Sequence, residues 1–270
     1  MSSEKQVVLI TGASSGFGQI TAQYLGERGY KVYGTSRSVR EPKGNYQMVQ
    51  LDVQKADTIQ QAVDQIIATE GRIDVLVNNA GVGLVGPMEL HGLDEVAQVM
   101  DTNVYGVFRV TQAVLPHMRQ QRNGRIINVS SISGLIGTPY RACYSASKAA
   151  VEALTESLSM EVKGMGITVC SLAPGDFDTG IGDRRVPLKR WMEPGDYEEA
   201  MRKTGELIDD HVSDGADPIL VAKLVHKICQ RSNPKLHYIV GPPMQKLAVK
   251  LKRVLPDRLF ERIIMSFYDM

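Results

Sequence analysis

Tyr144 and Lys148 have the clearest chemical potential in the chain, because "YSASK" sets a phenol and a primary amine four positions apart. Residues four apart share one face of a helix. A neighbouring ammonium favours the phenolate and draws the pKa of the phenol down from about 10 toward neutrality. Such a phenol can supply the proton that a carbonyl oxygen needs when a hydride is added to its carbon. A tyrosine with a lysine four residues later is more often an ordinary surface pair, so other motifs must support this interpretation.

The stretch "TGASSGFG", Thr11 to Gly18, has the composition of a phosphate-binding turn. It follows the apolar run "VVLI" and precedes a segment with helical spacing. Unpaired backbone N–H groups and the positive end of a helix dipole attract a phosphate, and glycine lets it approach closely. The loop is expected to hold a pyrophosphate, although its GxxxGxG spacing departs from GxGxxG. Its candidate cofactor contacts are Gly12, Ser14, Ser15, Gly16, Phe17 and Gly18.

The residues after the second strand candidate indicate which dinucleotide this loop holds. Enzymes that select NAD place an acidic side chain there, which binds the ribose 2′-hydroxyl and repels a 2′-phosphate. In "GTSRS" this position holds Ser36, and Arg37 follows it. A guanidinium can bind a 2′-phosphate with charge-assisted hydrogen bonds. The sequence therefore predicts NADP, against the alternative that Arg37 is only a solvated loop residue.

These motifs need a framework, and the chain alternates short β-branched runs with longer segments of helical spacing. Such alternation indicates a parallel sheet with helices on both faces. We expect one α/β domain over residues 1–270, with a Rossmann-type doubly wound sheet of about seven strands. The irregular stretch 180–217 is a candidate substrate lid, and residues 242–270 form a basic amphipathic helical tail. The strand candidates are "VVLIT", "KVYGTSR", "YQMVQLDV", "DVLVNNAG", "GRIINVSS", "ITVCSLAPG" and "HYIVG".

Composition and charge argue against several classes of protein. Of the 270 residues 43% are hydrophobic and 23% charged, and the formal net charge of +1 gives no general attraction to nucleic acid. No apolar run approaches the roughly 20 residues of a membrane-spanning helix, and "MSSEKQ" lacks the apolar core of a signal peptide. The three cysteines form no CxxC pair and fit reduced thiols, so a cytoplasmic location is expected. The five histidines lack the HExxH spacing of metal ligands, and no metal is expected.

Four further motifs lie where strands are expected to end, and ligands bind at such ends in open α/β sheets. They are "NNAG" at 78–81, "SSISG" at 130–134, "YSASK" at 144–148 and "PGDFDT" at 174–179. With the glycine loop, and in this order, they make the chain resemble the short-chain dehydrogenase/reductase family over about residues 5–180. Within that family the chain is similar to NADP-preferring members of the hydroxysteroid and retinol dehydrogenase kind.

The resemblance implies a catalytic role for several residues. Tyr144 matches the family's acid/base, and Lys148 matches a lysine that also holds the nicotinamide ribose. Ser131, thirteen positions before Tyr144, matches the serine whose hydroxyl binds the substrate oxygen and stabilises charge there. Ser130 and Ser133 are nearby alternatives, and Ser133 could instead line the substrate pocket.

The resemblance also implies a role for Asn103 and for a set of cofactor contacts. Asn103, in "DTNVYG", matches a residue that positions a water in a proton relay behind the lysine; alone it would more often cap a helix or form a buried hydrogen bond. Asp52 matches an adenine contact but could equally cap the next helix. Asn79 could merely satisfy the backbone of a turn. The implied contacts are Asp52, Val53, Asn79, Ala80, Gly81, Pro174, Gly175 and Thr179, with Tyr144 and Lys148; Thr179 matches a threonine that touches the nicotinamide carboxamide.

The sequence therefore predicts an oxidoreductase that transfers a hydride between NADP(H) and a small-molecule carbonyl or alcohol. A non-catalytic dinucleotide-binding regulator is the alternative, but the complete set of Asn103, Ser131, Tyr144 and Lys148 speaks against it. Apolar residues near the expected cleft favour a bulky substrate, steroid-like, retinoid-like or long-chain, unless they only pack the lid onto the domain. These residues are Leu84, Val85, Val186, Leu188, Trp191, Met192 and Met201.

Partners beyond the substrate depend on the family and on the tail. Members of the resembled family are commonly dimers or tetramers, so a homodimer or homotetramer is expected. The tail could pack on the core, contact a partner subunit or make a peripheral contact with a membrane. It could also dock another protein, which would make the Rossmann core incidental. The apolar positions of the tail are Leu247, Val249, Leu251, Leu255, Leu259, Ile263 and Phe267.

Overall fold

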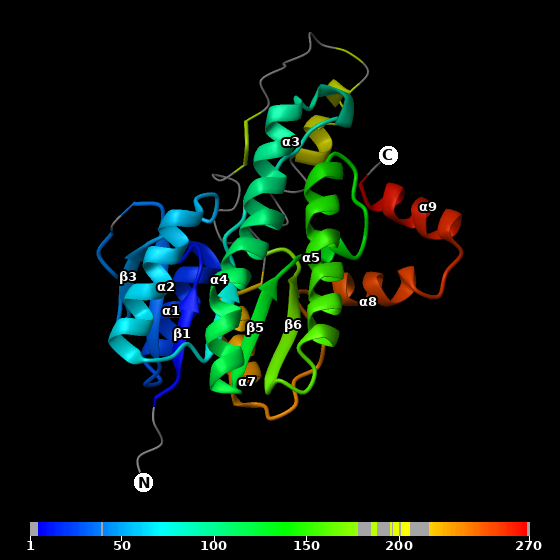
Figure 1. Ribbon diagram of the computed structural model, residues 1–270. Helices are drawn as coiled ribbons and strands as arrows, with labels where there is room; N and C mark the ends of the chain where they lie inside the picture. The colour runs from blue at the N-terminus through cyan, green and yellow to red at the C-terminus, as the bar shows by residue number, and fades with distance from the viewer. Residues whose placement is uncertain are drawn as a thin grey trace.

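The computed structural model describes residues 5–38, 40–177, 185–187, 195, 197–199, 201–205 and 216–268. Within these residues seven strands form one parallel sheet in the order β3-β2-β1-β4-β5-β6-β7 (Figure 1). The strand order reverses between β1 and β4, which confirms the predicted Rossmann-type doubly wound sheet. Each strand candidate is found: β1 (Val7–Ile10), β2 (Lys31–Ser36), β3 (Gln47–Gln50), β4 (Val75–Asn78), β5 (Gly124–Val129), β6 (Ile167–Pro174) and β7 (His237–Val240).

Helices cover both faces of the sheet, and alternate residues of β1 show why. Val7 and Leu9 belong to one buried core, which α2 and α4 complete. Val8 and Ile10 belong to a second core on the other face, which α1 and α7 complete. A strand that is apolar on both faces requires this two-sided cover. The helices are α1 (Gly16–Gly26), α2 (Ala56–Glu70), α3 (Leu93–Met100), α4 (Gly106–Gln121), α5 (Ala142–Glu161), α7 (Ile219–Gln230), α8 (Pro243–Lys252) and α9 (Asp257–Phe267).

A π-helical turn, η2 (Asp101–Tyr105), joins α3 to α4. The apolar spacing of residues 93–118 predicts one continuous helix, and the wider turn is the difference. A π turn inserts an extra residue and so re-aims the side chains around it, which is why such turns are frequent at functional sites. Asn103 lies in this turn and is fully buried.

The candidate lid at 180–217 is described only in part. Arg185 forms an isolated β-bridge with Gly83, and Val186 packs against Leu84. This short described piece therefore lies on the loop that follows β4. The predicted substrate contacts Leu188, Trp191 and Met192 lie outside the described residues.

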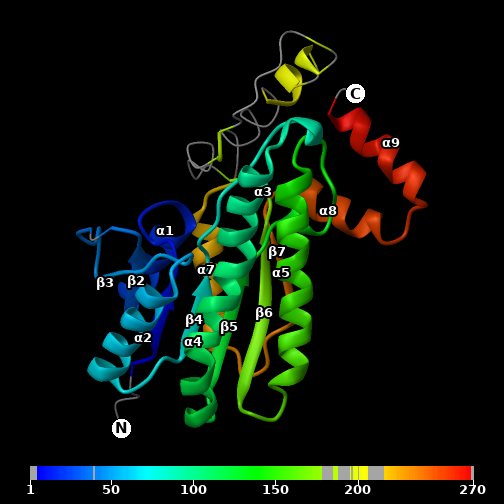
Figure 2. The same ribbon diagram turned by 45° about the horizontal axis from the view of Figure 1, so that its top comes forward.

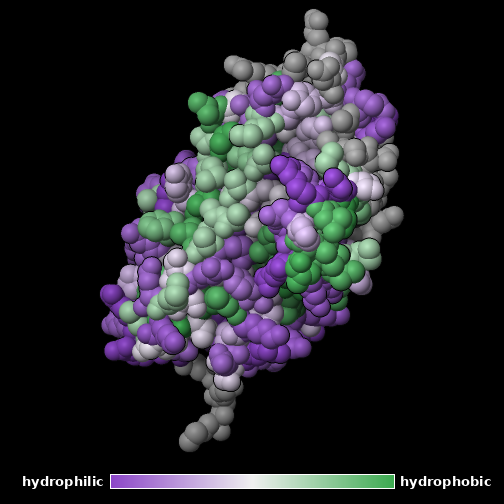
Figure 3. Space-filling model, turned by 90° about the vertical axis from the view of Figure 1, so that its right-hand side faces the viewer, coloured by the Kyte–Doolittle hydropathy of each residue, from purple (hydrophilic) through white to green (hydrophobic). Residues whose placement is uncertain are grey.

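The tail folds back on the body of the molecule as α8 and α9 (Figure 2). Val249 and Phe260 are buried against Ile136, in the loop after β5, so packing on the core accounts for one face. Figure 3 views the side on which α8 and α9 lie and shows apolar side chains gathered among charged ones. No helix of the described chain is both long enough and apolar enough to cross a membrane. The outward-facing apolar residues Leu247, Leu259, Ile263 and Phe267 are 42% to 48% exposed.

Candidate active site

The loop between β1 and α1 contains glycines at points where a side chain does not fit. Gly12 and Gly16 have φ angles of +67° and +55°, in the left-handed region that favours glycine. A Cβ on Gly18 would overlap the carbonyl oxygen of Gly12. Ser15 is the N-cap of α1, but its side chain makes no capping hydrogen bond. The first N–H groups of α1 are thus available to an anion, which fits a pyrophosphate.

Asn79 ties this loop to the end of β4. Its side-chain amide donates to the carbonyl oxygens of Thr11 at 2.9 Å and Gly12 at 3.2 Å. The Thr11 hydroxyl in turn accepts the N–H groups of Asn79 at 2.9 Å and Ala80 at 3.0 Å. Because β1 and β4 flank the point where the strand order reverses, these bonds fix the loop where ligands bind in such sheets. Asn79 therefore satisfies turn backbone, and it also lines a cavity.

A first cavity lies beside the glycine loop and the ends of β2 and β3. Arg37 is exposed there, and its guanidinium has no hydrogen bond or ion pair with another described residue. Ser36 is buried and donates its hydroxyl to a backbone carbonyl two residues later. Asp52 accepts the N–H of Gln54 at 3.0 Å and does not cap α2, whose N-cap is Lys55. Of the predicted cofactor contacts, the first cavity is lined by Gly12, Ser14, Ser36, Arg37, Asp52, Val53, Ala80 and Gly81.

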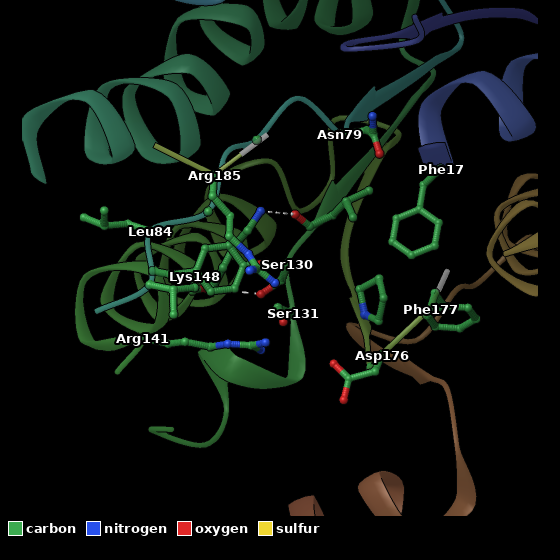
Figure 4. A pocket seen from close by; sticks show the side chains of 17 residues that line it. Phe17, Asn79, Leu84, Ser130, Ser131, Arg141, Lys148, Asp176, Phe177 and Arg185 are labelled. Atoms are coloured by element: carbon green, nitrogen blue, oxygen red, sulfur yellow. Dashed lines mark hydrogen bonds between the residues drawn. The ribbon is translucent and has the colours of Figure 1, made fainter. Parts of the chain in front are cut away.

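A second cavity adjoins the first, since Gly81 and Arg185 line both. Figure 4 shows side chains that line the second cavity. Phe17 enters it from α1, and its ring meets the ring of Phe177 edge to face at 5.2 Å. Some predicted residues line neither cavity: Ser15, Gly16 and Gly18, which shape the loop, and Met201. Thr179 lies outside the described residues. Of the predicted residues, the second cavity brings together Phe17, Asn79, Gly81, Leu84, Val85, Ser131, Tyr144, Lys148, Pro174 and Gly175, while Val186 lines the first.

Tyr144 and Lys148 lie close together on α5, as their spacing predicts. The Lys148 ammonium is 5.9 Å from the centre of the Tyr144 ring, and it donates to the carbonyl oxygen of Val129 at 3.0 Å. Burial lowers the pKa of Lys148 to about 8, and the carboxylate of Glu152 partly opposes this effect. The lysine thus changes charge much nearer neutrality than a solvated lysine does.

The pKa of the Tyr144 phenol differs from the expectation. Burial raises it, while the hydrogen-bonded Ser131 hydroxyl and the Arg141 guanidinium oppose the rise. The expectation that Lys148 draws this pKa toward neutrality is therefore wrong for the structure as described. The physical reason is that the ammonium is directed at a backbone carbonyl and not at the phenol oxygen.

Three serines follow β5, and their contacts distinguish them. The hydroxyl of Ser130 donates to the carbonyl oxygen of Lys148 at 3.2 Å and so holds α5. Ser133 is buried and does not line the second cavity, so its predicted alternative place in the pocket is wrong. Ser131 accepts the N–H of Ser133 at 3.1 Å and lines the cavity, and its hydroxyl opposes the rise in the pKa of Tyr144. Among these three serines, Ser131 is the one placed to share a substrate oxygen with the phenol.

Asn103 fastens the loop after β4. Its side chain accepts the N–H of Val82 and donates to the carbonyl oxygen of Val82, each at 2.9 Å, and it also donates to Ser147 Oγ at 3.0 Å. A Cβ on Gly81 would lie 3.2 Å from Asn103 Oδ1 and 3.4 Å from Lys148 Nζ. The asparagine and the lysine therefore approach the same point of the backbone.

Gln245 of α8 fixes the segment after β6, and sequence reasoning missed this contact. It accepts the N–H of Asp176 at 2.9 Å and donates to Asp176 Oδ2 at 2.5 Å. A Cβ on Gly175 would overlap Gln245, so the contact explains the glycine. The partners are 69 positions apart, and no local motif marks them. Sequence reasoning also missed Arg141, Asp176, Phe177 and Arg185 as lining residues of the second cavity.

Comparison with known proteins assigns the chain to a family. A family model described as short chain dehydrogenase matches residues 6–188. A 3-ketodihydrosphingosine reductase of Bacteroides thetaiotaomicron is 44% identical over 265 residues, which is 98% of each chain. The 17-beta-hydroxysteroid dehydrogenase type 1 of Mus musculus is 35% identical over 86% of this chain and 72% of its own. A short chain dehydrogenase/reductase of Burkholderia phymatum in complex with NAD is 26% identical, with a TM-score of 0.80 and 94% of each chain covered.

These matches agree with the motifs and with the cavity that gathers them. The relatives are reductases and dehydrogenases by name, so the alternative of a regulator without turnover is not supported. Solved structures that resemble the chain hold NAD or NADP. The chain belongs to the short chain dehydrogenase family, and it is a dinucleotide-dependent oxidoreductase that acts on CH–OH and C=O groups.

Proposed function

We propose that the protein reduces a long-chain apolar ketone with NADPH and oxidises the matching alcohol in the reverse direction. The observation that carries the proposal is a single cavity that presents Ser131, Tyr144 and Lys148 together. That cavity is the second one described above, and it adjoins the first cavity, which lies beside the uncapped start of α1 and is proposed to hold the dinucleotide.

Ser131 and Tyr144 act on the same substrate oxygen. Both residues line the second cavity, and the Ser131 hydroxyl opposes the rise in the pKa of Tyr144, so a carbonyl oxygen bound between them meets two donors. A bound nicotinamide supplies the hydride. Tyr144 then gives its proton to the alkoxide, and Ser131 stabilises the negative charge that develops on it. The Lys148 ammonium, 5.9 Å from the centre of the Tyr144 ring, is assigned to the nicotinamide ribose, and Asn103 holds the loop beside Lys148 and positions a water behind it.

NADP is the proposed form of the cofactor. Arg37 presents a guanidinium without a described partner at the first cavity, and position 36 carries a serine where an acid would repel the 2′-phosphate. The pyrophosphate is assigned to the loop Gly12 to Gly18. The adenine is assigned to Asp52 and Val53, and the nicotinamide half to Asn79, Ala80, Gly81, Tyr144, Lys148, Pro174, Gly175 and Thr179.

The apolar walls of the second cavity support the choice of substrate. Leu84 and Val85 line one part of it, and Phe17 and Phe177 another. Of the two relatives, one is named for 3-ketodihydrosphingosine and one for a hydroxysteroid. The first matches nearly the whole chain at higher identity, which favours a long-chain ketone over a steroid.

The test is a series of ketones of increasing chain length, with a steroid ketone included, assayed by NADPH oxidation. The value of kcat/KM should rise with chain length. Tyr144→Phe should bind NADPH like the parent but lose about 10² to 10⁴ in kcat, since only the transferable proton is removed. Turnover of small polar carbonyls alone, or a near-normal kcat for Tyr144→Phe, would contradict the proposal.

We further propose a single-domain homo-oligomer located in the cytoplasm. Tyr105 and Phe108, at the junction of η2 and α4, are 54% and 53% exposed and offer apolar area to a second copy. Cys170 and Cys229 are buried, Cys143 is half-buried, and none is paired, which agrees with a reducing compartment. Light scattering of the purified protein should give a dimer or a tetramer.

The tail is proposed to make a peripheral contact with a lipid surface. Its outer face combines exposed Leu259, Ile263 and Phe267 with basic side chains, a pattern typical of helices that lie in a membrane interface. The parent should sediment with anionic liposomes. A double variant, Ile263→Ser with Phe267→Ser, should stay in the supernatant. Equal absence of binding in both would remove this option.

A further inference from the structure

The outer face of the tail concentrates apolar side chains. Thirteen large apolar side chains of the described residues are exposed, and seven of them belong to α8, α9 and the turn that joins them. Exposed apolar residues that are scattered singly are ordinary, whereas a gathered patch marks a contact with another surface. Figure 3 shows this side of the molecule, with apolar side chains gathered among charged ones. The seven are Met244, Leu247, Val254, Leu259, Ile263, Met265 and Phe267.

The same segment carries a surplus of positive charge. Residues 243–268 contain six basic side chains and two acidic ones. The acidic Asp257 is paired with Lys252 at 2.8 Å. The acidic Glu261 is paired with Arg258, also at 2.8 Å. The other four basic side chains are exposed and have no acidic partner among the described residues, so the apolar patch lies among cations that attract an anionic lipid surface. These four are Lys246, Lys250, Arg253 and Arg262.

Both helices of the tail also reach the second cavity. Near the start of α8, Gln245 bonds the N–H and the Oδ2 atom of Asp176. At the end of α9, Tyr268 is buried. Burial raises the pKa of its phenol, while the Arg141 guanidinium opposes the rise and the Asp176 carboxylate adds to it. Arg141 and Asp176 both line the second cavity, and Figure 4 shows their side chains reaching into it. The two ends of the tail are therefore attached at the substrate side of the active site.

The outer face and the cavity side of the tail meet at the end of α9. The rings of Phe267 and Tyr268 pack edge to face, with their centres 5.3 Å apart. Phe267 is 48% exposed, whereas Tyr268 is buried. Earlier in the same helix, Phe260 packs against Ile136 in the loop after β5. One side of α9 thus belongs to the apolar outer face, and the other supports residues that border the cavity.

We infer that the tail binds an anionic lipid surface beside the rim of the second cavity, so that the ketone enters the cavity directly from the lipid. The inference rests on the proposed function, because a long-chain apolar ketone resides in lipid and a small polar one does not. Transfer of an apolar chain into water is unfavourable in proportion to its length. A direct path keeps the chain in apolar surroundings from the lipid to Leu84 and Val85 in the cavity.

The experiment presents one long-chain ketone in two kinds of vesicle, with NADPH oxidation as the readout. Anionic vesicles contain equal parts of phosphatidylglycerol and phosphatidylcholine, and neutral vesicles contain phosphatidylcholine alone. The parent should reduce the ketone about tenfold faster in anionic vesicles. This advantage should shrink at high salt, because salt screens the attraction between the basic tail and the lipid. A short-chain ketone dissolved in water should be reduced at the same rate with either vesicle.

A mixed sample separates direct uptake from activation by lipid. It contains the ketone in neutral vesicles and an excess of anionic vesicles without ketone. The protein then binds lipid that holds no substrate, so the parent should show only the slow rate of the neutral vesicles. A fast rate in this sample would overturn the inference, because lipid binding would then activate the enzyme without delivering the ketone.

Variants of the outer face test the same path. Ile263→Ser combined with Phe267→Ser should lose the tenfold advantage of anionic vesicles and keep the parent rate on the short-chain ketone. Met160→Ser is the matched control, since Met160 is 70% exposed on α5, outside the tail, and its replacement should keep the advantage. If the double serine variant does not fold, Arg253→Gln combined with Arg262→Gln takes its place, because it reduces the charge of the tail and leaves the apolar patch intact.

The outcomes distinguish this inference from the proposed function. Equal rates of the parent in anionic and neutral vesicles overturn the inference. So does a tail variant that slows both ketones by the same factor or that changes the oligomeric state in light scattering, since the tail would then support the fold or a subunit contact. A parent that reduces neither ketone with NADPH or NADH overturns the proposed function instead.

Discussion

Glu152 places a buried carboxylate one helical turn from Lys148 on α5. It accepts the hydroxyl of Ser171 at 2.6 Å and meets His237 Nδ1 at 3.0 Å. Its charge raises the pKa of Lys148 against the effect of burial. The ammonium that we assign to the nicotinamide ribose therefore depends on a residue that lines neither cavity.

Glu152→Gln should move the alkaline limb of kcat/KM to lower pH by about one unit. The limb moves in this direction because the ammonium is less stable without the carboxylate. The pKa of Lys148 then falls below its value of about 8. The measurement is the pH profile with a saturating cofactor. Glu156→Gln is the control, because Glu156 contacts the other ring nitrogen of His237, Nε2, at 3.2 Å but is largely exposed. Superimposable alkaline limbs for the parent and Glu152→Gln would contradict the prediction.

Arg37 and Ser36 should decide the choice of dinucleotide. Hydrogen bonds to charged groups contribute about 1.5–3 kcal/mol, so Arg37→Ala should weaken NADPH by about one to two decades and leave NADH nearly unchanged. Ser36→Asp should act more strongly because it adds repulsion of the 2′-phosphate. Both effects are read from kcat/KM with each cofactor. A parent that prefers NADH, or an unchanged preference in Arg37→Ala, would refute the assignment.

At the scale of elements, local patterns predicted most of the structure around the site. Strand β1 is apolar on both faces because helices cover both, and a continuous apolar run of this kind can be recognised in a sequence. The π turn at Asn103 could not be predicted from the sequence, because it depends on the hydrogen bonds between that side chain and the loop after β4. The Gln245 contact with Asp176 joins distant segments and is invisible to any local pattern.

Gly18→Ala tests whether the glycine loop needs its close contacts. The added Cβ would overlap Gly12 O and would lie 2.5 Å from Asn79 Nδ2. The amide of Asn79 is the group that ties the loop to β4. Overpacking of this kind costs about 1 to 3 kcal/mol, which should weaken NADPH by roughly one to two decades. Gly137→Ala is the matched control, since no atom lies within 4 Å of the added carbon. Fluorescence titration with NADPH gives both affinities, and equal values would count against the assigned role of the loop.

At the scale of the whole molecule, the two cavities meet on the carboxyl side of one sheet, and that arrangement follows from topology. The glycine loop, "NNAG", "SSISG" and "PGDFDT" each lie at or just after a strand end, so a parallel sheet had to bring Gly12, Asn79 and Ser131 together, whereas "YSASK" opens α5. The polar environment was less predictable. The pKa of Tyr144 depends on burial, Arg141 and Asp176, and no spacing in the sequence reports these contacts.

The tail offers a last test, because it supports the substrate side of the molecule and not the cofactor side. Phe260 packs against Ile136 in a cluster separate from the two main cores, and the same tail carries Gln245 to Asp176. Phe260→Ala should loosen α8 and α9 before the sheet unfolds, since it empties the centre of that cluster. The KM for the ketone should then rise about tenfold while the Kd for NADPH stays near the parent value. Hydrogen exchange should quicken in α8 and α9 alone. Leu259→Ala, at the adjacent and 46% exposed position, should leave all three measurements unchanged. Equal losses for ketone and NADPH in Phe260→Ala would show that the tail supports the whole fold and has no selective link to the substrate.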